Sequence, residues 1–398
     1  MALQKVEAFQ RLLLDAALKH KCPVITVLKV NYDLVEVNDH LQGNGEEDAA
    51  VLMITDEKAM AKRYLSVLTV FNLVAMLVRS GNTMSLRDVY YCSPLFKSQT
   101  ESNAAVRDLG NILSLSRHEM GIIPVARGFC AGALRFRTRQ VRDQSQSRSQ
   151  SREDEKGDNA HDDMHGSGNN DNRDRNEGWS PWTDCSVPVS SGGQGVPISS
   201  FWSNANVEVE LSVSAQTLII IEKEGIFHRL CEDSLWKAGG RMILVTGCGQ
   251  PDMATRALVR RLTDQFPRLL AVGLFDYNPY GVGILSNYRF GSSQGRLVHE
   301  GRNLSVPRIK WLGLRESQIQ LQLQEHPPIQ GHMEPLSVMD RRRLRGLLAS
   351  ANLEPSYKQS LLAMQQRGFK CELEALFVRG LHYPTAFIQR ALIAADYI

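Results

Sequence analysis

Residues 217–230, TLIIIEKEGIFHRL, join a β-rich apolar run to the start of a helix. The same order returns downstream, where Met242 to Val245 predicts a strand, Ala254 to Phe266 a helix and Leu269 to Phe275 a further strand. Buried apolar strands that alternate with amphipathic helices indicate a parallel sheet with helices on its faces. We therefore expect the C-terminal half to be an α/β domain built on a doubly wound parallel sheet.

Acidic residues end two of these predicted strands, because Glu222 follows Ile221 and Asp276 follows Phe275. In such sheets ligands bind outside the carboxyl ends of the strands, so the two carboxylates should converge at one edge. Neighbouring carboxylates repel each other unless a cation lies between them, and Mg²⁺ is held by one or two carboxylates with waters and phosphate oxygens. The pair therefore indicates a magnesium site near phosphate, although either acid alone is more often a helix cap or the partner of a basic side chain.

A third oxygen ligand is expected from Asn278, which stands in the run DYNPYG at residues 276–281. The turn-forming residues after it allow the chain to approach a bound ion. The carbonyl oxygen of Asn278 is neutral, so an ion that it helps to hold should be bound more weakly than by a second carboxylate.

Residues 58–140 predict helical segments followed by an apolar, strand-like end, and SLRD at residues 85–88 resembles the capping box that begins a helix. Short helices with brief connections indicate a helix-turn-helix, a module that places one helix in the major groove of DNA. Apolar residues and glycines between Ile122 and Leu134 predict a short hairpin, the wing of a winged-helix domain. A small helical bundle without a ligand fits the same pattern.

The segment RDVYY, residues 87–91, lies inside this predicted helix-turn-helix. Arg87 and Tyr91 are four residues apart and share one face of a helix, where a guanidinium could steady a phosphate or a phenolate. A free tyrosine ionises near about pH 10, so it needs such help to act as a nucleophile near neutrality. Two adjacent tyrosines are otherwise packing residues, and the motif alone leaves both interpretations open.

The chain has 398 residues and 43% hydrophobic composition, which is enough apolar material for two packed cores. Its longest strongly apolar run, Leu68 to Val78, is much shorter than the roughly 20 residues that cross a bilayer, so we expect a core helix and no membrane association; no secretory signal is visible. The seven cysteines contain no C-x-x-C pair, which favours a reducing intracellular compartment over a zinc knuckle or a disulfide framework. A net charge of +3 neither requires nor excludes nucleic acid.

Residues 140–177 have Val141 and Met164 as their only large apolar side chains and are otherwise rich in Ser, Gln, Arg, Asp, Asn and Gly. Such a stretch cannot bury enough surface to offset the entropy lost on ordering, so we expect a disordered insertion. Its arginine–serine segment, residues 147–152, is typical of a solvated loop, with phosphorylation or nucleic-acid binding as alternatives.

Three groups of basic residues could follow a DNA duplex or could equally form solvated helix faces. They are Lys58, Lys62 and Arg63; Arg256, Arg260 and Arg261; and Arg341, Arg342, Arg343 and Arg345. His118 is expected to have a surface or capping role before any part in proton transfer.

Five blocks of the sequence stand in an order that is more specific than any one motif. They are RDVYYCSPLFKSQTESNAAVRDLGNILSLSRHEMGI (87–122), IIIEKEGIFHRL (219–230), ILVTGCGQPDMATRALVRRL (243–262), LFDYNPYGVGILSNYRFGS (274–292) and WLGL (311–314). Together they resemble the meiotic recombination (sporulation-eleven) protein family, relatives of the DNA-cleaving A subunit of DNA topoisomerase VI. The resemblance covers most of the chain outside residues 141–178.

The resemblance implies an α+β chain in which a winged-helix (CAP-like) domain precedes a Toprim-type doubly wound parallel-sheet domain. The chain then divides into an N-terminal helical arm (1–57), the winged-helix domain with the nucleophilic tyrosine (58–140), a low-complexity, largely disordered insertion and linker (141–198), and the metal-binding Toprim domain with a C-terminal extension (199–398).

The resemblance also assigns roles to single residues. In the family the second tyrosine of R-D-x-[YF]-Y attacks DNA, which implies that Tyr91 is the nucleophile and Tyr90 its non-nucleophilic neighbour. The glutamate of the E-K pair and the first aspartate of D-x-D-P-x-G bind the metal, which here are Glu222 and Asp276.

This chain departs from the family pattern at two positions. Asn278 stands where the second aspartate is usual, and Cys248 stands where the lysine of G-K-G-x-P-D is usual. The departures leave the metal affinity and one phosphate contact open.

The resemblance implies a nuclear homodimer that makes meiotic double-strand breaks in duplex DNA to initiate homologous recombination, with Tyr91 forming a 5′-phosphotyrosyl link assisted by Mg²⁺. No nucleotide-binding loop of the G-x-x-x-x-G-K-[ST] type is visible, so an ATP-dependent step would belong to a GHKL ATPase-like partner similar to the B subunit of topoisomerase VI, beside other meiotic recombination factors. Three alternatives stay open: a type IIB enzyme subunit like the A subunit of topoisomerase VI, a metal-dependent Toprim hydrolase that does not use Tyr91, and a noncatalytic DNA-binding scaffold derived from the family.

Overall fold

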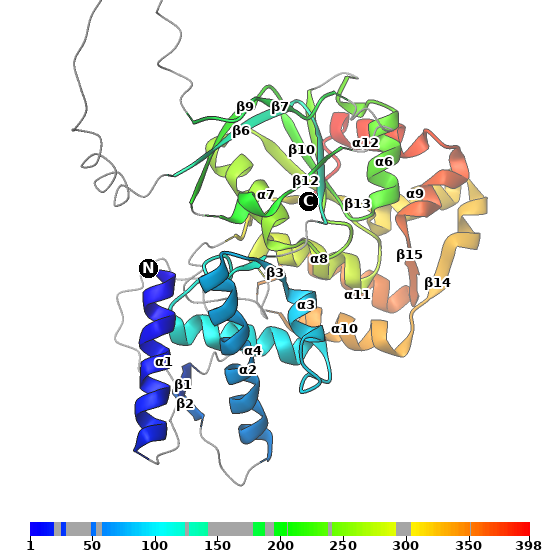
Figure 1. Ribbon diagram of the computed structural model, residues 1–398. Coiled ribbons are helices and arrows are strands. Elements are labelled where there is room, and N and C mark those ends of the chain that lie inside the picture. The colour runs from blue at the N-terminus through cyan, green and yellow to red at the C-terminus, as the bar shows by residue number, and fades with distance from the viewer. Residues whose placement is uncertain are drawn as a thin grey trace, which may run out of the picture. The chain divides into compact units, whose positions relative to one another are not determined.

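The computed structural model describes residues 1–19, 25–28, 49–52, 58–123, 127–141, 178–187, 195–204, 206–237, 241–291, 304–350 and 352–398. The chain forms two compact units, drawn in Figure 1. The first unit consists of Met1–Ala126 and Leu285–Pro307, and the second of Arg127–Ile284 and Arg308–Ile398. Each unit is described by itself.

The first unit is mainly helical. Its elements are α1 (Ala2–Leu18), β1 (Ile25–Leu28), β2 (Ala49–Leu52), α2 (Lys58–Ser80), β3 (Met84–Ser85), α3 (Leu86–Tyr91), α4 (Gln99–Leu113) and β4 (Ile122–Ile123). Helices α1, α2 and α4 contact one another around a single apolar core. The core includes Tyr64, Val70 and Val74 of α2, Leu109 of α4 and Val89 of α3, all of which are at most 1% exposed.

Helix α2 is the core helix that the apolar run at Leu68 to Val78 predicts, because seven of its side chains belong to the buried cluster. Its segment Ala61–Ser80 is also long and apolar enough to cross a membrane by length and composition. The core helix of a soluble protein passes the same test, and the burial of α2 against α1 and α4 accounts for its apolar character.

Helix α3 begins at the predicted capping box. The Asp88 N–H donates to Ser85 Oγ over 3.1 Å, and the Ser85 N–H donates to Asp88 Oδ2 over 3.2 Å. The reciprocal pair satisfies two N–H groups that a helix start leaves without partners, so this prediction is confirmed.

The predicted wing hairpin is wrong. Strand β4 pairs in parallel with β3, whereas β5 (Phe129–Gly132) lies in the large sheet of the second unit, antiparallel to both β11 (Met242–Thr246) and β8 (Val196–Pro197). Cys130 and Ala131 are at most 1% exposed, as expected for a strand inside a sheet that is covered on both faces. The winged-helix assignment for the helical part of the first unit stays a prediction.

The second unit is built on a six-stranded sheet with the order β13-β12-β10-β11-β5-β8. Strands β10 (Thr217–Ile221), β11, β12 (Leu270–Leu274) and β13 (Lys310–Gly313) are parallel, as the sequence predicts, and the two added strands are antiparallel. Helix α6 (Glu224–Glu232) packs on β10 and β11, and α7 (Met253–Gln265) packs on β11. Helix α8 (Pro279–Phe290) follows β12.

The C-terminal segment returns to the edge of this sheet where the parallel strands end. It contains α9 (Glu316–Glu325), β14 (Met333–Pro335), α10 (Val338–Ala349), α11 (Pro355–Arg367), β15 (Phe369–Cys371) and α12 (Tyr383–Ile393). Strand β15 pairs with β14, and Cys371 exchanges two backbone hydrogen bonds with Tyr277, of 2.9 and 3.0 Å. This bridge brings residues 371–374 beside the loop that follows β12.

A smaller sheet carries a ladder of alternating arginine and tryptophan side chains. Its order is β7-β6-β9, with β6 at Leu134–Gln140, β7 at Thr183–Asp184 and β9 at Val207–Val213. The guanidiniums of Arg135 and Arg137 lie 5.3 and 4.9 Å from the Trp182 ring centroid, and those of Arg137 and Arg139 lie 5.0 and 4.8 Å from that of Trp179. The three arginines also pair with acids: Arg135 with Asp184, Arg137 with Glu210 and Arg139 with Glu208.

Parts of the predicted linker therefore form strands, namely β7 and β8. The predicted disordered insertion falls on residues 142–177, which lie outside the described residues, as do residues 188–194.

We expect Trp182→Ala to lower the free energy of unfolding by about 2 kcal/mol, because the change removes a partly buried ring and two cation–π contacts. Urea denaturation followed by circular dichroism measures the loss. Val187→Ala is the control, since Val187 lies on the same segment and is 58% exposed. Equal stability of the two variants would show that the ladder does not stabilise the fold.

Candidate functional site

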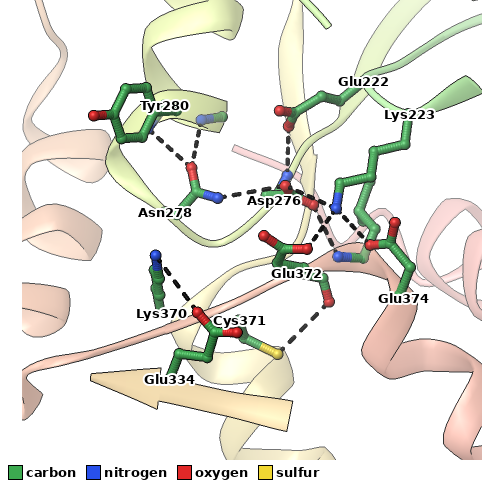
Figure 2. A network of polar contacts seen from close by, with 12 residues as sticks. Glu222, Lys223, Asp276, Asn278, Tyr280, Glu334, Lys370, Cys371, Glu372 and Glu374 are labelled. Carbon is green, nitrogen blue, oxygen red and sulfur yellow. Dashed lines mark hydrogen bonds and ion pairs between the residues drawn. The ribbon is translucent and has the colours of Figure 1, made fainter. Parts of the chain in front are cut away.

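The two strand-end acids lie together. Strands β10 and β12 are hydrogen-bonded neighbours in which Ile221 is opposite Leu274, and Glu222 and Asp276 follow directly. The Asp276 N–H donates to Glu222 Oε2 over 2.9 Å, and Figure 2 shows both side chains at the same edge of the sheet. Glu222 is 8% exposed and Asp276 is 3% exposed. The structure thus brings together the two carboxylates that the sequence predicts to converge.

Burial makes both carboxylates hard to ionise. Burial, followed by the negative charge of Asp276, raises the pKa of Glu222 to about 8. Burial also raises the pKa of Asp276 to about 6, although the Leu373 N–H and the Lys223 ammonium act in the opposite direction. Two acids held in this state favour a bound cation, because a cation would offset both desolvation and mutual repulsion.

A lysine and two further glutamates adjoin the acid pair. Lys223 Nζ lies 2.6 Å from Glu374 Oε2, 2.8 Å from Glu372 Oε2 and 3.4 Å from Asp276 Oδ2 (Figure 2). Burial alone would lower the pKa of Lys223, but the hydrogen bonds to the two glutamates and the charge of Asp276 outweigh it and raise the pKa. Lys223 is therefore a fixed positive charge beside Asp276.

The sequence pattern does not identify Glu372 and Glu374 as neighbours of Asp276. They stand almost one hundred positions downstream, and the bridge between Cys371 and Tyr277 brings them to the site. The Leu373 N–H, which lies between them in the chain, donates to Asp276 Oδ1 over 2.8 Å. Their alternation around a buried leucine is the only local signal, and it does not identify a partner.

Asn278 is placed differently from the predicted third ligand. Its Oδ1 accepts the N–H groups of Tyr280 and Gly281, over 2.9 and 2.7 Å, and so caps the start of α8. Its Nδ2 lies 3.4 Å from Asp276 Oδ2, so the side that faces the acid pair is a donor. The prediction that Asn278 supplies an oxygen ligand stays a prediction, and this conformation does not favour it.

The donor set fits one hard divalent cation. Glu222 and Asp276 offer carboxylate oxygens, the ligands that Mg²⁺ prefers, and burial leaves their charges poorly compensated. Lys223 and the Asn278 amide occupy neighbouring positions with groups that do not bind a metal ion. Within the described ranges, no three His, Cys, Asp or Glu side chains form a cluster suited to a metal. The residues thus fit a single ion held largely by waters and phosphate oxygens.

Cys248 lies in the turn between β11 and α7 with a φ of 50°. Its Sγ donates to the carbonyl oxygen of Arg127 over 3.0 Å, and its N–H donates to Thr246 Oγ1 over 3.1 Å. Burial and the nearby charge of Glu224 raise the pKa of the thiol to about 11. The side chain is therefore neutral near pH 7 and supplies no positive charge for a phosphate.

The first unit carries the predicted nucleophile. Tyr91 lies at the end of α3 and is 66% exposed, with its ring centroid 4.9 Å from that of Tyr90. A hydrogen bond with Tyr91, and then the charge of its phenolate, raise the pKa of the Arg87 guanidinium. The helix therefore presents an exposed phenol with a cation beside it, as the spacing predicts.

Several of the other basic residues are engaged with acids. Lys62 pairs with Glu101 over 2.7 Å, Arg63 with Asp108 over 2.8 Å and Arg260 with Asp264 over 2.6 Å. The side chain of Lys58 lies outside the described residues. In the third group, Arg341, Arg342 and Arg345 are exposed on α10.

Comparison with known proteins gives two family matches. The Toprim-domain family of the topoisomerase 6 A subunit (Topoisomerase 6 A/Spo11, Toprim domain) matches residues 217–390, which include Glu222 and Asp276. The family described as "Type IIB DNA topoisomerase" matches residues 62–122, which include Tyr91.

Full-length relatives agree with these matches. The chain is 30% identical over 330 residues to the meiotic recombination protein SPO11-1 of Oryza sativa subsp. japonica, which covers 82% of this chain and 72% of the relative. It is 29% identical over 347 residues to SPO11-2 of Arabidopsis thaliana, covering 85% and 76%. It is 27% identical over 333 residues to SPO11 of Mus musculus, covering 83% and 70%.

Glu222→Gln should stabilise the metal-free protein at high pH. A carboxyl whose pKa is raised on folding, here from 4.5 to about 8, stabilises the fold fully below pH 4.5, and this contribution is lost as the pH rises through 8. The amide keeps the acceptor for the Asp276 N–H but carries no charge. We expect the variant to exceed the parent by at least about 1 kcal/mol at pH 9 in urea denaturation with a chelator present, with the difference shrinking toward pH 5.

Glu224→Gln is the control for this pH dependence, because its side chain is 52% exposed at the same end of the sheet. A stability difference for Glu222→Gln that is the same at every pH would contradict the expected burial of charge.

Asn278→Asp should strengthen Mg²⁺ binding by about tenfold, because one oxygen can keep the cap of α8 while the other replaces the amide nitrogen beside Asp276. Isothermal titration calorimetry measures the affinity, with Asn82→Asp, an exposed change in the first unit, as the control. An unchanged affinity would remove position 278 from the metal site.

Proposed function

The chain belongs to the family that unites SPO11 proteins with the A subunit of topoisomerase VI, and from this premise we propose that it is a DNA-cleaving transesterase that makes meiotic double-strand breaks in the nucleus. The observation that carries the proposal is the pairing of two features in one chain. An exposed tyrosine stands beside a cation on α3, and two buried carboxylates stand at the edge of a Toprim sheet. Neither feature alone would cut DNA through a protein-linked intermediate.

In the proposed reaction, Tyr91 Oη attacks a backbone phosphorus. The bond from phosphorus to the 3′ oxygen breaks, the phenol gives up its proton and the departing 3′ oxygen gains one. The product is a 5′-phosphotyrosyl link and a free 3′ hydroxyl, so one phosphate ester replaces another without water or a redox partner. Arg87 would hold the phenolate and the attacked phosphate in place.

Glu222 and Asp276 would hold Mg²⁺, which when bound would neutralise charge that develops on the phosphate oxygens. Lys223 would keep Asp276 and the two glutamates of the C-terminal segment in position around it. The tyrosine and the acids belong to different units of the chain, and a homodimer around one duplex is the family arrangement by which each chain would supply one half of a site.

The relatives named SPO11 are meiotic recombination proteins by name, which favours a meiotic role over a general topoisomerase. A role like that of the A subunit of topoisomerase VI, a type IIB enzyme, remains the second candidate, since both family matches include such enzymes. In either role a GHKL ATPase-like subunit would supply ATP hydrolysis, and other meiotic recombination factors would be further partners. The departures at Asn278 and Cys248 favour weak metal binding, and a noncatalytic scaffold is the limit of that trend.

Tyr91→Phe should abolish covalent capture of DNA. The full chain, with its ATPase-like partner and Mg²⁺, is incubated with end-labelled duplex, denatured and analysed for label that migrates with protein. We expect labelled adduct with the parent, none with Tyr91→Phe, and a reduction of at least about 100-fold with Glu222→Ala. Tyr90→Phe is the matched control and should keep the adduct.

Cut ends that persist in Tyr91→Phe would indicate the hydrolase instead. Duplex binding without any cleavage by the parent would indicate the scaffold.

A further inference from the structure

Tyr280 is an exposed aromatic side chain at the start of α8, four positions after Asp276. It is 41% exposed, although the residues on either side of it are buried. Its backbone is fixed, because its N–H donates to Asn278 Oδ1. Figure 2 shows the ring projecting away from the acid pair, beside Asn278.

One face of this ring is covered by an arginine from another element. The Arg343 guanidinium lies 4.6 Å from the Tyr280 ring centroid, and Arg343 Nε donates to the carbonyl oxygen of Pro279 over 3.2 Å. Gly283 leaves the space for it, since a Cβ there would lie 2.4 Å from Arg343 Nη2. A rigid ring with a cation behind it and an exposed side is a surface on which a second flat group can stack.

The same helix carries an exposed basic stripe. Arg341, Arg342 and Arg345 fall at spacings of one, three and four residues on α10, and all three are exposed. None of them has an ion-pair partner within the part of the chain that the structure describes. The helix's own acid, Asp340, is buried and pairs with Lys370 over 3.3 Å. The stripe is therefore suited to a polyanion.

A stacking surface beside a basic stripe matches the two chemical features of nucleic acid, flat bases and a chain of phosphates. We propose that Tyr280, backed by Arg343, is a positioning residue that stacks on an unstacked base of the DNA next to the metal site, while the stripe on α10 holds the adjoining phosphates. This inference rests on the proposed function, because it assumes that DNA is the substrate.

The proposal makes a distinction between two forms of DNA. In an intact duplex every base is already stacked, and opening a step has a cost that the ring must offset. At a mismatch or an abasic site that cost is already met, so the ring should contribute fully there and little elsewhere. The contribution of Tyr280 should therefore appear as a preference for opened duplex, and the contribution of the arginines as affinity for both forms.

The experiment measures binding to two duplexes that differ at one position. The full-length chain carries Tyr91→Phe so that no covalent link forms, and one duplex is intact while the other has 2-aminopurine opposite an abasic site. We expect the parent to prefer the opened duplex by about tenfold and to quench its 2-aminopurine fluorescence on binding. Tyr280→Ala should lose both the preference and the quenching, and Tyr280→Phe should keep both.

The arginines give an independent readout. Arg342→Gln with Arg345→Gln should weaken binding to both duplexes alike and lower the salt slope by about one for each arginine removed. Leu321→Ala, a change at an apolar side chain that is 51% exposed on α9, should alter neither duplex. Thermal melts followed by circular dichroism confirm that each variant is folded.

A Tyr280→Ala protein that keeps the full preference and quenching would overturn the proposal. Failure of the proposed function appears elsewhere, as the absence of covalent adduct in the parent with Tyr91 restored. The two failures are therefore distinguishable.

Discussion

The hydrogen bond from the Asp276 N–H to the Glu222 carboxylate is the contact on which the site depends. It joins the residues that follow two adjacent strands, and it holds two acids within a few ångströms of each other in a nearly dry environment. The packing around it leaves no room for adjustment at Gly281, where a Cβ would lie 2.5 Å from the Asp276 carbonyl oxygen and 3.0 Å from Glu222 Oε2. The start of α8 is therefore pressed against the acid pair, and glycine is required there by close approach.

Because the acids are close and buried, their surroundings are arranged to limit repulsion. Lys223 supplies one positive charge and ties Asp276 to the C-terminal segment through Glu372 and Glu374. Asn278 presents an amide nitrogen where another aspartate would add a third negative charge. Both features lower the cost of folding the site without a metal ion, and both reduce the charge available to hold one. Stability of the metal-free fold and affinity for the ion are thus opposed at this edge of the sheet.

Local patterns in the sequence were sufficient for the elements and for the acid pair. Apolar runs and the SLRD capping box identify strands β10 to β12 and the start of α3, because these signals act over a few residues. The convergence of Glu222 and Asp276 follows from parallel strand geometry alone. Pairings between distant segments are different. The apolar segment Phe129–Gly132 was expected to pair with its neighbour but lies in the large sheet, because alternation specifies a buried strand and not its partner. Glu372 and Glu374 were missed for the same reason.

The replacement of a lysine by Cys248 has a consequence for where the phosphate charge of DNA is met. The thiol is neutral near pH 7 and donates to a backbone carbonyl, so the turn before α7 offers no side-chain cation. Lys223 is already engaged by three carboxylates. In the described part of the second unit, the exposed arginines of α10 are then the basic residues nearest in the fold to the start of α8 that are not committed to an acid, because Arg343 of the same helix contacts Tyr280 directly. A chain that has lost one phosphate contact at the sheet edge depends more on this helix to bring the duplex to its acids.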